Sequence, residues 1–486
     1  MKISTKGVGR YGVVMMMALI IVIITIMTST IVNTTRIPQE WKSRSIYQII
    51  TDRFSPTNSN PNQSCLLYTY CGGTFIGIMN HLQYIKNLGF NAIWISPIVL
   101  NLPNGYHGYW MKDLFRVNPH FGTESDLLKL VKTAQSMDIW VMVDVVFNHA
   151  GPVGFDFAEI SPFNQSSHYH AYCEITDWTN QTQVEICRLA GLPDLDQSNS
   201  FVFNTLNSWI SDYIINYFGF DGIRIDTVAE VPKSFWANLK QNILIPKNGN
   251  IFAIGEVFNG DLNYVAPYAN ILGSTLHYPL YFTLRNIFTQ YGSMYQIRNI
   301  VQQARSLVKD TSVLGVFIDN HDNPRFLNFN SDYKLYQNAL TYVLMSEGIP
   351  IFYYGSEQGF SGGVDPQNRE PLWTTNFNEN SYLYQFVQKI TKFRNMHIQE
   401  FIQNPLQVER YAANNFYAFT RGQIFVATTN VGSNYNQLQY TITYHPYQNG
   451  QVLCDVFWPQ DCITVTNGQF TITLLNGESK IFYPQH

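Results

Sequence analysis

The chain has 486 residues and a formal net charge of -4 at pH 7, with 45% hydrophobic and 13% charged residues. This balance is typical of a folded globular protein and excludes extended disorder, and the length predicts a large domain with smaller modules. No stretch rich in Lys and Arg offers a footprint for phosphate backbones, so we expect no nucleic acid as a partner.

The first thirty residues have the pattern of an export signal. Lys2, Lys6 and Arg10 precede an apolar run over residues 13–27, which has the length of a signal peptide. With its tail to Val32 the run approaches the ~20 residues that cross a bilayer, so an uncleaved anchor is the alternative. We favour cleavage and expect a secreted or lumenal protein, an endosomal or lysosomal compartment included, that meets a membrane only if the segment is retained.

Six cysteines form three couples that are close in sequence: Cys65 with Cys71, Cys173 with Cys187, and Cys454 with Cys462. Short disulfide loops have this spacing, and disulfides suit an exported protein. Other pairings and free buried thiols are the alternatives. Sequons at Asn33, Asn62, Asn164 and Asn180 add weak support for an exported glycoprotein.

Between Ser45 and about Tyr354, short apolar runs alternate with longer helical patterns, which is the rhythm of parallel βα units. Eight such units close into a (β/α)8 barrel, an α/β fold whose chemistry lies at the carboxyl ends of its strands. The eight predicted strands begin at Ser45, Asn91, Ile139, Asp221, Ile251, Gly273, Ser312 and Ile349.

One helix is predicted in detail. Thr123 can cap it, Glu124 and Asp126 favour its positive end, and one face is apolar. The residues of that face are Leu127, Leu128, Val131, Ala134 and Met137.

The third unit departs from the rhythm, because about fifty residues separate His149 from the next helix near Phe201. A loop of that length usually carries function, and we expect a small inserted domain. After a last helix at 382–394, alternating residues from about Gln407 predict an antiparallel β-module. The expected divisions are 1–34 for the signal peptide or anchor, 35–148 and 206–400 for the barrel, 149–205 for the inserted domain, and 401–486 for a C-terminal β-sandwich.

Acids and histidines stand at four predicted strand ends: Asp144, His149, Arg224, Asp226, Glu256, His321 and Asp322. Hydrolysis of an acetal needs two carboxylates, one to protonate the leaving oxygen and one to meet the oxocarbenium-like carbon. A single acid at a strand end is more often a helix cap or an ion-pair partner. The combination predicts a glycoside hydrolase.

In order and spacing, the segments DVVFNH, GIRID, IGEV and DNHDNPR resemble the conserved regions of the α-amylase family of glycoside hydrolases, with the greatest likeness to fungal-type α-amylases. The resemblance runs from about Trp41 to Trp373. It implies retaining hydrolysis of α-1,4-glucosidic bonds in starch and glycogen, so an α-glucan polysaccharide is the expected partner, and we expect a monomer. It also implies Asp226 as nucleophile, Glu256 as general acid/base and Asp322 as the carboxylate that stabilises the transition state.

The same resemblance assigns substrate-binding residues. Arg224 would favour the ionised form of Asp226, and Glu256 would need a poorly solvated site to stay protonated. In YHGYW and DPQNRE, aromatic core packing and a surface ion pair are the alternatives. The implied substrate residues are Tyr109, His107, Trp110, His149, Arg224, His321, Asp365 and Arg369.

A structural Ca2+ is also implied by the resemblance. Asn148 and Asp194 would bind it through side chains, and Glu185 and Glu230 through backbone carbonyls. Ordinary turn residues are the alternative.

The sequence departs from the fungal pattern after the nucleophile, where Ala229 and Glu230 replace the usual Lys-His. A glutamate there also occurs in neopullulanase-like relatives, which accept α-1,6 bonds, so such an enzyme or an α-glucosidase is the first rival reading. The second is an inactive, membrane-anchored homologue such as an amino-acid transporter heavy chain. The complete catalytic set argues against it.

Overall fold

The computed structural model describes residues 36–246 and 249–485. The predicted export signal and the sequon at Asn33 lie outside the described residues. Within the described ranges, no helix combines the length and the apolar character needed to cross a membrane.

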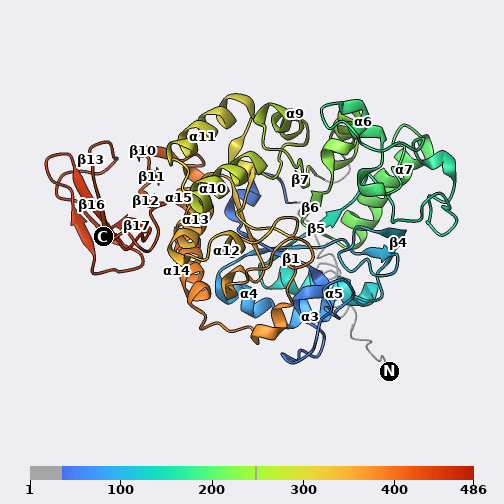
Figure 1. Ribbon diagram of the computed structural model, residues 1–486, viewed down its shortest axis with the longest axis horizontal. Coiled ribbons are helices and arrows are strands. Elements are labelled where there is room, and N and C mark those ends of the chain that lie inside the picture. Colours follow the sequence, from blue (N-terminus) through green and yellow to red (C-terminus); the bar gives the residue numbers. More distant parts are fainter. Residues whose placement is uncertain (1–35, 247–248, 486) are drawn as a thin grey trace, which may run out of the picture. The chain divides into compact units, whose positions relative to one another are not determined.

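A parallel sheet lies at the centre of the fold (Figure 1), with the hydrogen-bonded strand order β7-β6-β5-β2-β1-β9-β8. Ile46 of β1 lies between Ala92 of β2 and Ile351 of β9. Seven of the eight predicted strands are therefore formed. They are β1 (Ile46–Ile49), β2 (Ala92–Ile95), β5 (Trp140–Val145), β6 (Gly222–Ile225), β7 (Phe252–Gly255), β8 (Gly315–Val316) and β9 (Ile349–Tyr353).

The strand predicted from Gly273 is reduced to two isolated bridges. Thr275 pairs with Gly255 of β7, and Leu276 pairs with Gly315 of β8, both in parallel orientation. These bridges join the two edge strands and close the barrel. The strand is short because His277 already caps helix α10 (Tyr278–Gln290), its side chain accepting a hydrogen bond from the Leu280 amide.

Side chains of the barrel strands alternate between two cores, as the two-residue period of a strand requires. Ile93 and Val141 belong to the large cluster shared with the surrounding helices. Ala92 and Trp140, their neighbours in sequence, belong to a separate cluster inside the barrel. At Gly315 a Cβ atom would lie 2.5 Å from Ile254 Cδ1, so the barrel interior is filled by side chains.

Helices surround the sheet (Figure 1), and α5 (Glu124–Ser136) shows why they form where they do. Thr123 and Asp126 exchange side-chain to backbone hydrogen bonds in a capping box, which confirms the predicted start of the helix. Its buried residues are Leu127, Leu130, Val131 and Ala134, whereas Leu128 is only half-buried.

The other helices of the barrel region vary in length, and two of them continue as π-helices. They are α2 (Thr51–Phe54), α3 (Phe75–Asn80), α4 (Leu82–Leu88), α7 (Ser200–Ser208) with the π-helix Trp209–Tyr217, α8 (Lys233–Asn238) with the π-helix Leu239–Leu244, α9 (Leu262–Leu272), α11 (Tyr295–Leu307), α12 (Phe326–Phe329), α13 (Tyr333–Met345), α14 (Tyr382–Met396) and α15 (Ile398–Gln403).

The long excursion between β5 and α7 contains one short helix, α6 (Gln181–Ile186). The Cys173–Cys187 disulfide closes the loop around this helix. A bridge between His149 and Asp194 ties the excursion to the end of β5. A bridge from Asp113 to Ser161 ties it to the hairpin of β3 (Val99–Asn101) and β4 (Met111–Val117).

The C-terminal residues form two antiparallel sheets with a shared apolar core, as predicted. One has the order β10-β11-β12-β17-β14-β15, and the other pairs β13 with β16. The strands are β10 (Val408–Ala412), β11 (Phe416–Arg421), β12 (Ile424–Thr429), β13 (Gln437–Ile442), β14 (Val452–Asp455), β15 (Cys462–Thr464), β16 (Phe470–Leu475) and β17 (Lys480–Pro484). The Cys454–Cys462 disulfide links β14 to β15, and with Cys65–Cys71 all three predicted pairings are confirmed.

Candidate active site

Arg224 of β6 organises the carboxylates at the carboxyl end of the barrel. One terminal nitrogen of its fully buried guanidinium lies 2.8 Å from both carboxyl oxygens of Asp144 and 2.7 Å from Asp226 Oδ1. The other lies 2.7 Å from Glu256 Oε2. Because β5, β6 and β7 are neighbours, the acids that follow or end these strands meet at one cation.

Glu256 lies in poorly solvated surroundings. It is only 7% exposed, and burial raises its pKa well above the usual range for a glutamate. The charges of Asp226 and Asp322 raise it further, while Arg224 opposes them. Tyr278 Oη donates to Glu256 Oε1 over 3.2 Å. Glu256 therefore has the poorly solvated surroundings that a general acid needs.

Tyr109 lies between Asp144 and His321. Its hydroxyl donates to Asp144 Oδ2 over 2.9 Å and lies 2.7 Å from His321 Nε2. The Gln48 amide nitrogen, which can only donate, lies 2.8 Å from His321 Nδ1, so the proton of His321 sits on Nε2. Burial lowers the pKa of His321 well below its usual value, and the imidazole is neutral.

The other sequence-predicted aromatic and histidine residues surround Tyr109. The His107 ring is stacked on the Tyr109 ring at 5.6 Å and meets the Trp110 ring edge-on at 4.9 Å. His149 Nε2 lies 3.2 Å from the Tyr109 carbonyl oxygen. Burial lowers the pKa of His149 as well, so it also is neutral.

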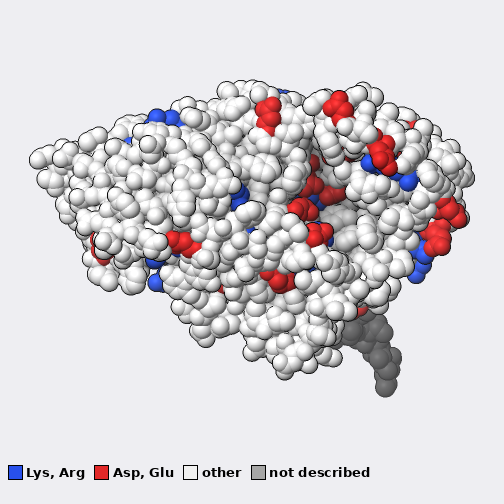
Figure 2. Space-filling model, in the orientation of Figure 1, with Lys and Arg blue, Asp and Glu red and all other residues white. Residues whose placement is uncertain are grey.

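These groups open into a cavity of about 360 Å³. Figure 2 shows acidic side chains gathered in a hollow near the centre of this face, while most of the surrounding surface is uncharged. Trp178 of the long excursion lines the cavity and is 60% exposed. The lining residues are Tyr109, His149, Trp178, Leu189, Leu192, Asp226, Thr227, Glu230, Glu256, Phe258 and Asp322.

The two residues that depart from the fungal pattern differ in position. Ala229 is buried and is not part of the cavity lining, whereas the half-buried Glu230 lines the cavity. Of these two residues, only the Glu230 side chain can therefore contact a molecule bound in the cavity.

Arg369 connects Asp322 to a second acid. Its guanidinium lies 3.7 Å from Asp322 Oδ1 and 3.0 Å from Asp365 Oδ1, and its Nε donates to the His321 carbonyl over 3.1 Å. Asp365 is half exposed, but Arg369 is only 5% exposed. The buried Arg369 thus joins the half-exposed Asp365 to Asp322, which lines the cavity.

The four residues assigned to calcium lie where the long excursion meets the barrel. The Asn148 amide lies 3.0 Å from both the Glu230 carbonyl oxygen and Asp194 Oδ1. With its nitrogen on that side Asn148 donates to both oxygens, whereas with its oxygen there three oxygens face one another, the set that a hard cation would hold together. Glu185 is in α6, whose Gln181 donates to the neighbouring Ala229 carbonyl over 2.9 Å.

The residues therefore fit a calcium ion through an amide, a carboxylate and carbonyl oxygens. Among residues 36–246 and 249–485, no group of three or more His, Cys, Asp or Glu side chains is placed to bind a metal.

Sequence reasoning assigned no role to several residues of the site. In the sequence, Asp144 is a strand-end acid and Tyr278 is the last residue of the sixth predicted strand. Gln48 lies within β1, and Trp94 Nε1 donates to Asp144 Oδ2 from β2 over 3.2 Å. Both resemble ordinary strand residues in the sequence, so only the structure reveals them.

The comparisons with known proteins agree with this geometry. Residues 48–399 match the family model described as "Alpha amylase, catalytic domain". The chain is 37% identical to the alpha-amylase of Saccharomycopsis fibuligera, over 92% of each chain, and 36% identical to alpha-amylase 2 of Schwanniomyces occidentalis, over 91% of this chain and 90% of that protein. Its structure is similar to that of an alpha-amylase from Malbranchea cinnamomea, with a TM-score of 0.88 and 34% identity over 92% and 97% of the two chains. The chain belongs to the α-amylase family of glycoside hydrolases.

Proposed function

We propose that this protein is an α-amylase, which hydrolyses α-1,4-glucosidic bonds within starch, glycogen and related oligosaccharides with retention of configuration. The observation that carries the proposal is the placement of Asp226 and Glu256 on adjacent nitrogens of the buried Arg224 guanidinium. Two carboxyl groups held this close suit a double displacement.

In this mechanism Glu256 protonates the leaving glycosidic oxygen while Asp226 attacks the anomeric carbon and forms a glycosyl-enzyme. The carboxylate of Glu256 then removes a proton from water, which displaces Asp226. Arg224 orients Asp226 by donating to its Oδ1 over 2.7 Å, and burial raises the pKa of Glu256 so that it keeps its proton. Asp322 opens onto the same cavity and would stabilise the positive charge of the transition state.

Substrate contacts follow from the residues around these acids. Tyr109 would stack on the glucose at the cleaved bond, with His107 and Trp110 supporting it. His149 and His321 would hydrogen-bond the same glucose, and Arg369 with Asp365 would bind the non-reducing side.

The names of the relatives, alpha-amylase in both fungal cases, favour this activity over α-glucosidase or neopullulanase-like activity. The complete set of Asp226, Glu256 and Asp322 disfavours an inactive homologue.

A calcium ion bound by Asn148, Asp194, Glu185 and Glu230 would have a structural role, clipping the excursion to the barrel. We further propose residues 149–205 as a small inserted domain and residues 401–486 as a β-sandwich domain. Three disulfides suit an exported, glycosylated protein, and we propose that it acts as a monomer on α-glucan outside the cytosol.

The test is product analysis on soluble starch, pullulan and maltotriose, with Glu256→Gln as the inactive control. We expect internal cleavage of starch, products released in the α configuration, and little release from pullulan. Early products in the β configuration would contradict the double displacement. Maltotriose cleaved in preference to starch would favour an α-glucosidase.

A further inference from the structure

Arg53 lies outside the catalytic cavity and is fully buried, at the end of β1 within α2. Its Nε forms an ion pair with Asp52 Oδ2 at 3.1 Å. Asp52 in turn accepts hydrogen bonds from the amides of Cys71 and Gly72, over 2.8 and 3.1 Å. A buried ion pair is costly to break, so these contacts fix the guanidinium in one place.

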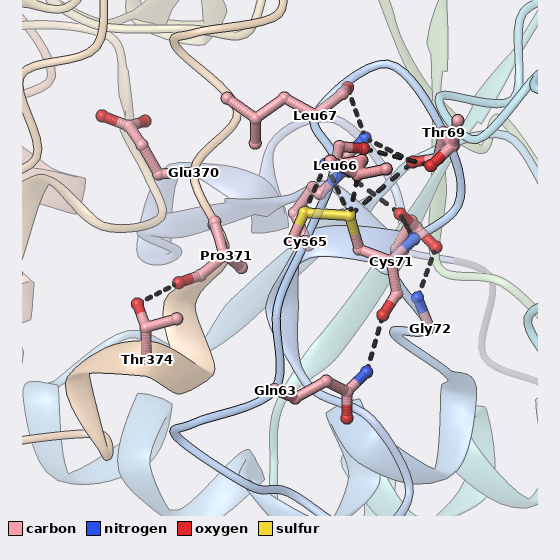
Figure 3. The surroundings of a disulfide bond; sticks show 12 residues. Gln63, Cys65, Leu66, Leu67, Thr69, Cys71, Gly72, Glu370, Pro371 and Thr374 are labelled. Carbon is pink, nitrogen blue, oxygen red and sulfur yellow. Dashed lines mark hydrogen bonds and ion pairs between the residues drawn. A yellow bond between two sulfur atoms is a disulfide. The ribbon is translucent and has the colours of Figure 1, made fainter.

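The loop closed by the Cys65–Cys71 disulfide wraps around this guanidinium. One terminal nitrogen of Arg53 donates to both sulfur atoms, at 2.8 Å and 3.0 Å. The other donates to the carbonyls of Leu67 and Thr69 over 2.8 and 2.9 Å. Figure 3 shows the disulfide with the carbonyl-bearing residues Leu67 and Thr69 beside it.

The free face of the guanidinium lies on Tyr106, with Arg53 Cζ 3.8 Å from the ring centroid. Tyr106 is buried and directly precedes His107. At its other end, Arg369 donates to the Tyr106 hydroxyl over 3.2 Å. One ring therefore connects Arg53 to Arg369, which contacts Asp322 and Asp365.

We propose that Arg53 is a positioning residue for the non-reducing side of the substrate site, held in place by the Cys65–Cys71 loop and acting through Tyr106 on Arg369. The inference rests on the proposed function, because it takes Arg369 and Asp365 as residues that bind the non-reducing side. It adds a functional role to a disulfide that touches no substrate. The loop fixes the position of the Arg53 guanidinium, and the stacked guanidinium fixes the position of the Tyr106 ring. The Tyr106 hydroxyl then orients the Arg369 guanidinium through their hydrogen bond.

The test measures cleavage of maltopentaose, labelled at its reducing end, by the full chain in calcium-containing buffer. Tyr106→Phe keeps the ring stack and removes only the hydroxyl that Arg369 contacts. We expect KM to rise about fivefold with kcat within about twofold, because the Tyr106 hydroxyl acts on the substrate only through Arg369 and its loss costs less than a lost direct hydrogen bond to a charged group. The distribution of labelled products should also change, because maltopentaose should bind less often in the modes that place glucose units on the non-reducing side.

Cys65→Ser with Cys71→Ser should change KM and the product pattern in the same direction. Combined with Tyr106→Phe it should add little, because both changes interrupt one series of contacts. The matched control is Cys454→Ser with Cys462→Ser, which removes a disulfide of the β-module and should lower Tm without changing KM or the pattern.

Wild-type cleavage of maltopentaose reports on the proposed function by itself. If the wild type cleaves and Cys65→Ser with Cys71→Ser behaves like the control, with a lower Tm but unchanged KM and pattern, the role of the loop is wrong. Full additivity with Tyr106→Phe would also overturn it.

Discussion

The mouth of the barrel and the C-terminal β-module use buried charge differently. At the mouth of the barrel, Asp144, Arg224, Asp226 and Glu256 are all largely removed from solvent. The core of the C-terminal β-module is mainly apolar, and its buried Asp455 accepts hydrogen bonds from the amides of Phe457 and Ile481 on Oδ1 alone, while Oδ2 is buried without a hydrogen-bond partner. Burying ions destabilises a fold unless they are paired. The barrel mouth therefore gathers its buried acids around one cation, whereas backbone amides hold the buried acid of the module.

The largest expected effect comes from neutralising the two central acids. Asp226→Asn and Glu256→Gln should each lower starch hydrolysis by about 10³-fold or more, because one loses the nucleophile and the other the transferable proton. Each substitution keeps the size of the side chain, so neither should unfold the barrel. Asp455→Asn, the matched change in the module, should leave kcat unchanged. Hydrolysis near the wild-type rate by Asp226→Asn would show that the two regions do not differ as described.

Arg224→Met sharpens the contrast, because it leaves three carboxyl groups without their shared cation. We expect a loss of about 3–5 kcal/mol in unfolding free energy, the usual cost of breaking a buried ion pair from one side, together with loss of activity. Denaturant unfolding of the two proteins at pH 7 measures it. A variant as stable as the wild type would mean that the carboxyl groups take up protons freely and need no cation.

Calcium removal should act on the barrel side alone. An ion that binds only the folded state at 100 times its Kd stabilises that state by about 2.7 kcal/mol, so chelation should lower Tm. Hydrogen exchange should quicken in residues 149–205 and stay unchanged in the β-module. An unchanged Tm after exhaustive chelation, with no metal found by elemental analysis, would exclude the calcium site.

The smallest effect concerns the pH dependence of Asp455, whose pKa burial raises to about 7. A folded pKa above the unfolded value means that the folded state holds the proton more tightly. The stability from Asp455 is thus present below the unfolded pKa and lost as pH rises through about 7. Subtracting the unfolding free energy of Asp455→Asn from that of the wild type at each pH cancels the contributions of the other acids. A flat difference between pH 4 and 8 would contradict the expectation.

Much of the fold could be predicted from the sequence because its signals are local. Strands buried on both faces give continuous apolar runs, and α5 carries its own cap at Thr123. The sixth strand could not be predicted in its true length. GSTLHY has a strand pattern, but the cap at His277 ends it after two bridges.

Part of the candidate site could likewise be predicted from the sequence, and part could not. The motif resemblance supplied Asp226, Glu256 and Asp322, and the structure brings these residues to one cavity. The contacts of Arg53 with Tyr106, and of Tyr106 with Arg369, span distant parts of the chain and leave no local pattern. Such contacts depend on how the loops fold together, which no spacing in this sequence encodes.

The shortened sixth strand gives the barrel a seam. Four backbone hydrogen bonds hold it: Gly255 to Ser274, Leu276 to Gly255, His277 to Gly315, and Gly315 to Thr275. So short a pairing, like the two-residue pairing of β8 with β9, contributes little to holding the cylinder closed. Glu256 and Tyr278 follow it, one on each side. The proton donor is therefore held less by the sheet than by the contacts of its side chain with Arg224 and Tyr278.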